Sequence, residues 1–380
     1  MDVYILDTSF NRIKVIDNIL SFIWTERYND AGDFEMTLPF ERSLLSIIQR
    51  DYYLEFTETD RLMIIESCEI TTDVENGSEM IVKGRSLESI LDRRIIWNQT
   101  IITGNLQNGV KTLINDAIIN PSIADRKIPN FKFIMSDDPL VTNCSIDSAQ
   151  FTGDNLLTVV LTLTQQFGLG FKIILNDNNE FEFSLYAGTY RTYDQLVVPP
   201  VIFSPEFGNV ISSSYFETAE GLKTVTLVAG EGEGADRVTA IVGSGGGIFR
   251  RELFTDARDI SSKTDDGDLT PAEYNKLLVQ RGIEKLVDNN NALIKLVDGE
   301  LETTQTFIIN QDYFLGDVVQ FRDDYHNEAN VRITEVIRSW DDTGYITYPT
   351  FDYIVDYDYL LAESEDILQT ENTNEIEIDL

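Results

Sequence analysis

The chain has 380 residues, of which 42% are hydrophobic and 11% aromatic. This is long enough for two to four compact domains and too apolar for a disordered chain. Its 65 acidic and 29 basic side chains give a formal net charge of −36, which opposes binding to the phosphate backbone of a nucleic acid.

The two cysteines, Cys68 and Cys144, are too few for a disulfide framework. Asp2, Asp7 and Arg12 interrupt the N-terminal stretch, so we expect no signal peptide there. No window approaches the roughly 20 apolar residues that a membrane-spanning helix needs. We therefore expect a protein made in the cytoplasm and carrying no membrane-spanning segment.

The N-terminal part of the chain, as far as Lys83, predicts short β-strands separated by turns. Runs rich in β-branched and aromatic residues lie at 3–6, 12–16, 33–38, 52–56, 62–65 and 79–83. Gly84 then breaks the pattern. Strands this short and this frequent indicate a small barrel or sandwich.

From Ser86 the apolar residues take the spacing of amphipathic helices. Leu87, Ile90 and Leu91 share one helical face, and Ser86 stands where it could cap the first turn. Two further helices are predicted over 110–118 and 154–167, the first of them ended by Pro121. An Asn-rich turn then joins two strands, at 171–175 and 180–185, into a predicted hairpin. Residues 96–200 therefore read as an α+β module inserted between β-rich parts.

The remainder returns to β-structure and ends in an acidic segment. Thr270-Pro271-Ala272-Glu273 has the composition of a helix start, with Thr270 as N-cap and Glu273 closing a capping box. Strands are predicted at 201–203, 222–229, 306–309, 317–321, 331–338 and 345–348. No Lys or Arg follows Arg338, while acidic residues accumulate over 356–380. Such a run is typical of a solvated tail, the alternative being a segment that docks on a basic patch of a neighbour.

Residues with catalytic or metal-binding chemistry are scarce. His326 is the only histidine, and the two cysteines lie far from it in the sequence. Because histidine is the commonest general base and metal ligand, this composition argues against most hydrolase and zinc mechanisms. Asp265-Asp266-Gly267-Asp268 hints at calcium, but an EF-hand alignment places Ser262 where the first Asp should stand. We predict no catalytic residue, no cofactor and no metal.

Two glycine-rich segments, 230–234 and 243–247, invite a nucleotide-binding interpretation. The first carries glutamates that would repel a pyrophosphate, and residues 238–242 after it look like a strand rather than a helix. The second lacks the Lys-Ser/Thr of a phosphate-binding loop. We interpret both as flexible loops.

Because basic residues are scarce in this acidic chain, clusters of arginine are candidate sites of ion pairing. Arg85, Arg93 and Arg94 flank the first predicted helix, and Arg250 and Arg251 precede Glu252. Arginine suits ion pairs at interfaces. Pairing within the chain is one interpretation, and contacts between subunits are the other.

A set of short motifs resembles the tail hub proteins, also called tail-associated or tail-tip proteins, of siphophages that infect Gram-positive hosts. In chain order, with Trp24 ahead of the first, they are AGDFEMTLP at 31–39, VKGRSLESILDRR at 82–94, TGDNL at 152–156, FSPEFGNV at 203–210, FRRE with DARD within 249–259, and YFLGDVV at 313–319. Each motif is weak alone, and their order gives the resemblance its specificity. It covers about residues 20–350.

The resemblance implies a mainly β fold with α+β insertions, built like the central hub of contractile-tail baseplates. Two tube-like β-barrels per subunit would let a homotrimer present a pseudo-sixfold ring to the hexameric ring above it. The domains expected are a first barrel at 1–95, completed by part of 201–242; the α+β insertion at 96–200; a second barrel at 201–355 with a helical insertion near 270–300; and the acidic tail at 356–380.

The function implied is that of a structural hub at the distal end of the virion tail. The ring would close the tail tube, join the distal tail protein ring to the tip, receive the C-terminus of the tape-measure protein, contact receptor-binding proteins, and let DNA pass on ejection without specific binding. Only the acidic segment follows the matched part, so the resemblance supplies no enzyme domain. Arg85, Arg93, Arg94, Arg250 and Arg251 become interface candidates. The alternatives are a peptidoglycan hydrolase acting through two carboxylates and a host-carbohydrate-binding tail protein.

Overall fold

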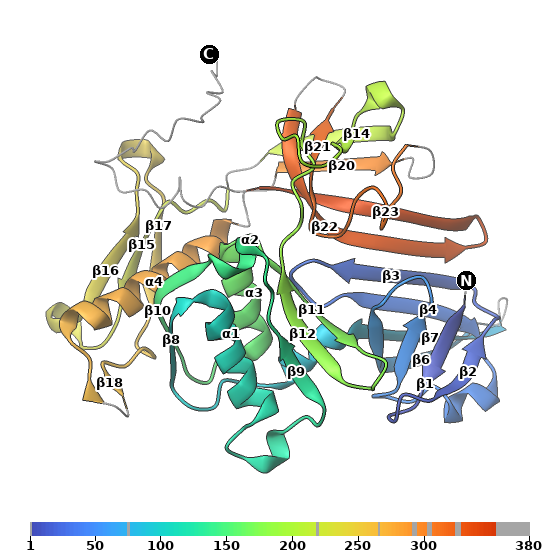
Figure 1. Ribbon diagram of the computed structural model, residues 1–380, viewed down its shortest axis with the longest axis horizontal. Coiled ribbons are helices and arrows are strands. Elements are labelled where there is room, and N and C mark those ends of the chain that lie inside the picture. Colours follow the sequence, from blue (N-terminus) through green and yellow to red (C-terminus); the bar gives the residue numbers. More distant parts are fainter. Residues whose placement is uncertain are drawn as a thin grey trace. The chain divides into compact units, whose positions relative to one another are not determined.

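The computed structural model describes residues 2–73, 77–217, 220–264, 267–290, 295–301, 306–323 and 328–354. It contains two compact units (Figure 1). Unit 1 is formed by Met1–Ala219 and Leu293–Ile354, and unit 2 includes Glu220–Ala292. No described helix is long and apolar enough to cross a membrane.

Unit 1 is built on one large, mainly antiparallel sheet. Its strand order is β13-β21-β22-β3-β4-β7-β6-β5-β1-β2, with β23 also paired to β22. The strands are β1 (Val3–Leu6), β2 (Arg12–Ile16), β3 (Ser21–Arg27), β4 (Asp33–Pro39), β5 (Tyr53–Phe56), β6 (Leu62–Asp73), β7 (Gly77–Ser86), β13 (Ile202–Phe203), β21 (Val318–Arg322), β22 (Glu328–Asp341) and β23 (Gly344–Tyr353). The path does not close on itself among the described residues, so the two predicted barrels stay a prediction.

Strict alternation explains why the first strands form one side of a core. In β4, Phe34, Met36 and Leu38 are buried while the residues between them are half-exposed. This period of two places the three side chains on one face of the sheet. Trp24 of β3 belongs to the same core, with its ring centroid 5.7 Å from that of Phe56. The sequence therefore determines which face is buried before any long-range pairing is known.

The long strand β22 joins two halves of this sheet. Its first residues pair with β21, and its later ones with β3, where Arg338 stands opposite Trp24. A buried ion pair, Arg338 to Glu26 at 2.7 Å, reinforces that junction. Residues 328–341 thus continue the N-terminal sheet. The sequence predicts that part of 201–242 would do so. From that expected range, only β13 joins this sheet among the described strands, through β21.

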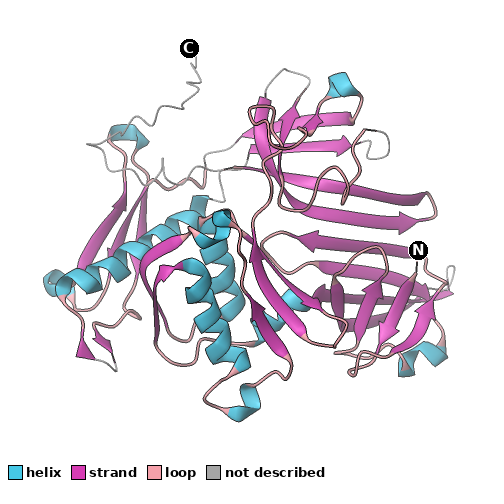
Figure 2. Cartoon of the chain, in the orientation of Figure 1, coloured by secondary structure: helices cyan, strands magenta, loops and turns pink. Residues whose placement is uncertain are grey.

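Residues 96–200 contain three α-helices and two small sheets (Figure 2). Helices α1 and α3 pack against each other, and their apolar faces belong to one core with β11 and β12. The elements are β8 (Thr100–Asn105), α1 (Leu106–Ile114), β9 (Phe131–Ile134), α2 (Pro139–Thr142), β10 (Ser145–Phe151), α3 (Leu156–Gln166), β11 (Gly170–Leu175) and β12 (Phe181–Tyr186). β10 pairs with β8, and β9 and β11 flank β12. The hairpin predicted at 171–185 is confirmed.

The first predicted helix differs from its expected form. Residues Leu87–Arg93 form a 3-10 helix, labelled η2, and Ser86 gives it no side-chain cap. The Ser86 hydroxyl instead accepts a hydrogen bond from the Gly32 amide at 2.8 Å. The Ser86 hydroxyl, which the local pattern assigned to capping the helix, therefore bonds to a residue distant in the sequence.

Unit 2 is a three-stranded sheet with one long helix packed on it (Figure 1). β15 (Val225–Ala229) lies between β16 (Thr239–Gly243) and β17 (Glu252–Asp256), and α4 (Pro271–Asn290) packs against β15 and β16. A Cβ atom at Gly282 would lie 2.6 Å from the Val242 side chain, so glycine permits this close approach. The remaining strand pairs are β18 (Lys263–Thr264) with β19 (Gly267–Asp268), and, in unit 1, β14 (Val210–Glu217) with β20 (Lys295–Leu301).

The capping box predicted for α4 is confirmed. The Glu273 carboxylate accepts from the Thr270 amide at 2.9 Å, and the Thr270 hydroxyl accepts from the Glu273 amide at 3.3 Å. Residues 220–292, which we placed inside a second barrel, nevertheless belong to a separate compact unit. Their strands β15, β16 and β17 pair with one another, and α4 covers one face of the sheet they make.

Glu284 makes the stability of α4 depend on pH. It is buried on the helix, with the Arg281 guanidinium 3.4 Å away and Lys285 and Asp288 nearby. Burial raises the pKa of Glu284 from 4.5 to about 7, against the opposing effect of Arg281. The folded state therefore holds a proton that the unfolded state releases, so stability falls as the pH rises from about 4.5 to 7.

We expect Glu284→Gln to stabilise the protein by on the order of 2 kcal/mol at pH 8 and to change little at pH 4. Urea unfolding at both pH values, followed by circular dichroism, measures the difference. Glu273→Gln is a control on the same helix: that exposed carboxylate has a lowered pKa, so its replacement should give no stabilisation at pH 8. Equal urea midpoints for Glu284→Gln and the unchanged protein at pH 8 would contradict the expectation.

Candidate functional site

A buried polar cluster connects the large sheet with residues 96–200. Arg61 pairs with Glu88, and both side chains are almost fully buried. The same Glu88 oxygen accepts from the Ile173 amide at 2.8 Å. In the same unit, the Tyr28 hydroxyl accepts from the Gly188 amide at 3.1 Å. These contacts fix how the inserted residues attach to the sheet.

Arg85 and Arg93, two of the predicted interface residues, pair within the chain. Arg85 makes two bonds to Glu66, at 2.9 and 3.0 Å, and a third to Asp92 at 3.0 Å. Arg93 pairs with Asp51 at 2.7 Å. Glu66 and Asp51 are distant in the sequence from the arginines they pair with, so the sequence around each arginine could not identify them.

Arg94 has a different environment. Its guanidinium donates to the backbone oxygens of Arg93 and Arg126, at 3.0 and 3.2 Å, and its buried Nε has no hydrogen-bond partner. Burial, together with the charges of Arg126 and Arg93, lowers the pKa of Arg94. The surroundings of Arg94 therefore hold an excess of positive charge.

Arg250 and Arg251 belong to unit 2, just ahead of β17. Arg250 pairs with Glu252 at 2.6 Å, and the Arg251 amide donates to the Thr224 hydroxyl at 3.0 Å. The five predicted arginines thus form two groups, one in each unit.

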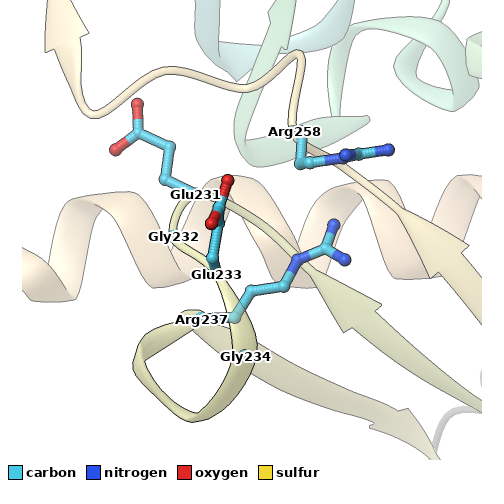
Figure 3. A pocket seen from close by; sticks show the side chains of 6 residues that line it. All are labelled: Glu231, Gly232, Glu233, Gly234, Arg237 and Arg258. Carbon is cyan, nitrogen blue, oxygen red and sulfur yellow. The ribbon is translucent and has the colours of Figure 1, made fainter.

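The first glycine-rich segment lines an open groove of about 540 Å³ in unit 2. Gly232 and Gly234 contribute to its wall, and Arg237 and Arg258 lie on the same side of it (Figure 3). Both arginines pair with Asp256. Their hydrogen bonds, that of Arg258 having the larger effect, lower the pKa of the Asp256 carboxyl to about 2. The residues after the segment form a strand, β16, as predicted.

Glu231 does not face the arginines of this groove (Figure 3). Its carboxylate accepts from the Ser262 hydroxyl at 2.6 Å and the Ser262 amide at 3.0 Å. These bonds, the hydroxyl first, lower the pKa of Glu231. The glutamate therefore ties the segment to the 261–262 loop, which makes it a structural residue.

The remaining candidates for catalysis or metal binding are the acidic residues, the two cysteines and the histidine. Among the residues that the structure describes, no group of three His, Cys, Asp or Glu side chains could hold a metal ion. Both cysteines are free, and burial raises the pKa of each thiol. His326, Asp265, Asp266 and the acidic segment 356–380 lie outside the described residues.

The feature that sequence reasoning missed is an exposed apolar row on unit 2. Leu227 of β15 lies between Ile241 of β16 and Phe254 of β17 in the sheet register, and all three side chains are exposed. They occupy the face of the sheet opposite α4. The central strand β15 has apolar residues on both faces, so its alternation does not reveal which side is covered. Only the helix position decides that.

The fold is that of phage tail proteins. The 43 kDa tail protein of prophage MuSo2 from Shewanella oneidensis aligns with a TM-score of 0.56 at 12% identity, covering 95% of this chain and 100% of that one. A tail protein from Neisseria meningitidis MC58 aligns at 0.53 and 12%, covering 92% and 96%. Prophage tail protein gp18 from Listeria monocytogenes EGD-e aligns at 0.52 and 13%, covering 93% and 94%. Identities this low establish the fold alone.

The sequence places the chain in a particular family. The family model of the Siphovirus ReqiPepy6 Gp37-like proteins matches residues 2–351, and the chain belongs to that family. A comparison with curated proteins finds no match. The chain is therefore a siphovirus protein with a phage tail protein fold.

Proposed function

We propose that the chain is the structural hub of a siphophage tail tip and that it acts in the virion, at the distal end of the tail. Three copies would form a ring that closes the tail tube, joins the distal tail protein ring to the tip and lets DNA pass on ejection. The observation that carries the proposal is the fold match to three phage tail proteins over more than 90% of both chains in each case. A Gram-positive host rests on the sequence resemblance alone and is part of the proposal.

The two halves of the large sheet are suitable tube-forming parts. One half, β1 to β7, surrounds a core that includes Trp24 and Phe34, and the other, β13 with β21 to β23, surrounds a core around Phe321. They meet at β22, which holds them as one piece. Two such parts per copy would give a trimer six similar elements around the tube axis, the number needed to meet a hexameric ring.

Charge supports a passage for DNA. With a formal charge of −36 per copy, a ring of three would repel the phosphate backbone of a duplex passing through it. Repulsion prevents the DNA from adhering during ejection, so the ring would guide DNA by its shape. The tape-measure C-terminus and the receptor-binding proteins remain proposed partners.

The mass of the assembled protein tests the proposal. Native mass spectrometry of purified protein should give three times the chain mass of 43.2 kDa, and electron microscopy should show a ring. Antibody labelling of virions should mark the distal tail end. A monomer at all concentrations, both alone and with the distal tail protein, would contradict the trimer.

We propose further that the chain is not an enzyme. A zymogram with host peptidoglycan separates this from the hydrolase alternative, because clearing by the purified chain requires a catalytic site. Binding to isolated host wall polysaccharide would favour the carbohydrate-binding alternative. Neither alternative has a specific structural observation in its favour.

Arg93 and Arg94 are the unit 1 residues through which we test the arginine interface. The Arg93–Asp51 pair is exposed and Arg94 is half-buried, so their joint replacement by Ala should cost each subunit little. As interface residues they should weaken the trimer more. Native mass spectrometry across a dilution series measures the first effect, and thermal unfolding the second. An unchanged trimer mass and unchanged stability would remove both residues from the interface.

A further inference from the structure

The exposed apolar row of unit 2 has the layout of a protein-binding surface. Relative exposures are 41% for Leu227, 65% for Ile241 and 59% for Phe254, although all three are large apolar side chains. The connection between β16 and β17 also exposes two large apolar side chains, Ile248 and Phe249, at 88% and 79%. Single exposed apolar residues are ordinary, but a contiguous patch on a sheet is characteristic of an interface.

The surroundings of this row strengthen that interpretation. On the exposed face of β17, Phe254 stands between two carboxylates, Glu252 and Asp256. Glu252 pairs with Arg250, and Asp256 pairs with Arg237 and Arg258. On the β17 side, the apolar row thus has a rim of arginine–carboxylate pairs, as protein interfaces commonly do.

The backbone of this sheet offers further contacts. Within the described residues, β16 and β17 each pair only with β15, so both outer edges of the sheet are open. The opposite face is already occupied by α4. A partner can therefore approach the apolar face and, at its margins, the unpaired strand edges.

Charge indicates which partner fits. Two copies of a −36 chain repel each other, so copies can meet only where the local charge is nearly balanced. Residues 220–292 carry 13 acidic and 9 basic side chains, whereas the whole chain carries 65 and 29. The net charge of this segment is −4 over 73 residues, against −36 over 380 for the whole chain, so its negative charge per residue is about six-tenths of the average. Its paired carboxylates add little repulsion.

We propose that a second copy of this chain covers the row Ile241–Leu227–Phe254 in the assembled ring. The proposal rests on the trimeric hub proposed above and identifies one surface that holds it together. It also gives Arg250, predicted from sequence as an interface residue, a place on the rim of that surface.

Two substitutions test the surface, Ile241→Asp and Phe254→Asp. Both side chains lie on edge strands and are well exposed, so each single chain should keep its fold, which circular dichroism and thermal unfolding check. We expect a buried carboxylate at either position to weaken the trimer roughly 100-fold, measured as the shift in the dilution midpoint by native mass spectrometry. Leu140→Asp in α2, with an exposure of 52%, is the matched control for one added negative charge.

The outcomes separate this proposal from the trimer itself. A wild-type chain that stays monomeric at all concentrations, both alone and with the distal tail protein, would overturn both. A wild-type trimer that stays equally stable in Ile241→Asp and Phe254→Asp, or weakens no more than in Leu140→Asp, would overturn this surface and leave the hub intact. Oxidative footprinting of the wild-type protein gives an independent measurement, since Phe254 should be protected in the trimer and reactive in the diluted monomer. Equal reactivity in the two states would also overturn the proposal.

Discussion

Glu88→Ala is expected to destabilise the fold of unit 1 by about 3–5 kcal/mol, one of the two largest effects we expect from a single substitution. The carboxylate holds the buried Arg61 guanidinium and accepts from the Ile173 amide at 2.8 Å. Its removal leaves a buried positive charge and a buried amide without their partner. The loss should appear in urea unfolding as a lower midpoint.

A pair of controls isolates the reason for this loss. Glu35→Ala removes an exposed ion pair, Glu35 to Lys83 at 2.6 Å, and should leave the urea midpoint nearly unchanged because solvent screens the two charges. The double replacement Arg61→Met with Glu88→Leu should recover much of the stability, because apolar pairs can substitute for buried ion pairs. A loss for Glu88→Ala no larger than for Glu35→Ala would show that the buried pair does not matter.

Gly84→Ala is expected to cost about 3 kcal/mol or more, through steric overlap rather than lost contacts. A Cβ atom at position 84 would lie 1.8 Å from the Ile64 carbonyl oxygen and 2.8 Å from the Phe34 ring. Because the first of these atoms is backbone, β6 and β7 would have to separate. Thermal unfolding should show a lower midpoint.

Gly246→Ala is the matched control, since a Cβ atom there would meet nothing within 4 Å and the backbone needs no left-handed conformation. It should change the free energy of unfolding by less than about 0.5 kcal/mol. Equal midpoints for Gly84→Ala and Gly246→Ala would contradict the steric argument.

Gly84 also illustrates how a local signal can be misread. From sequence we expected it to interrupt the strand, but β7 runs through it to Ser86. The β6–β7 pairing is irregular between Ile65 and Ser67, beside the position opposite Gly84. The glycine is needed for close packing within the sheet, and packing of this kind has no signature in a single sequence.

The sequence determined elements whose causes lie within a few residues. The hairpin around Asn176 and the capping box at Thr270 depend on side chains that bond to neighbouring backbone, so their patterns predicted them. The motifs at residues 20–350 also indicated the kind of protein, and the match to a siphovirus family and to phage tail folds agrees with that resemblance.

Only the tertiary structure decided which distant segments meet. It paired β22, near the C-terminus, with β3, near the N-terminus. It gave Arg61 its partner Glu88, and it separated residues 220–292 as a unit whose sheet exposes Leu227. The physical reason is that strand pairing and face burial depend on which apolar surfaces come together in the folded chain. Apolar residues repeating with a period of two or 3.6 indicate that one face of a strand or helix is apolar. Only the position of α4 determines that Leu227 lies on the exposed face of its sheet.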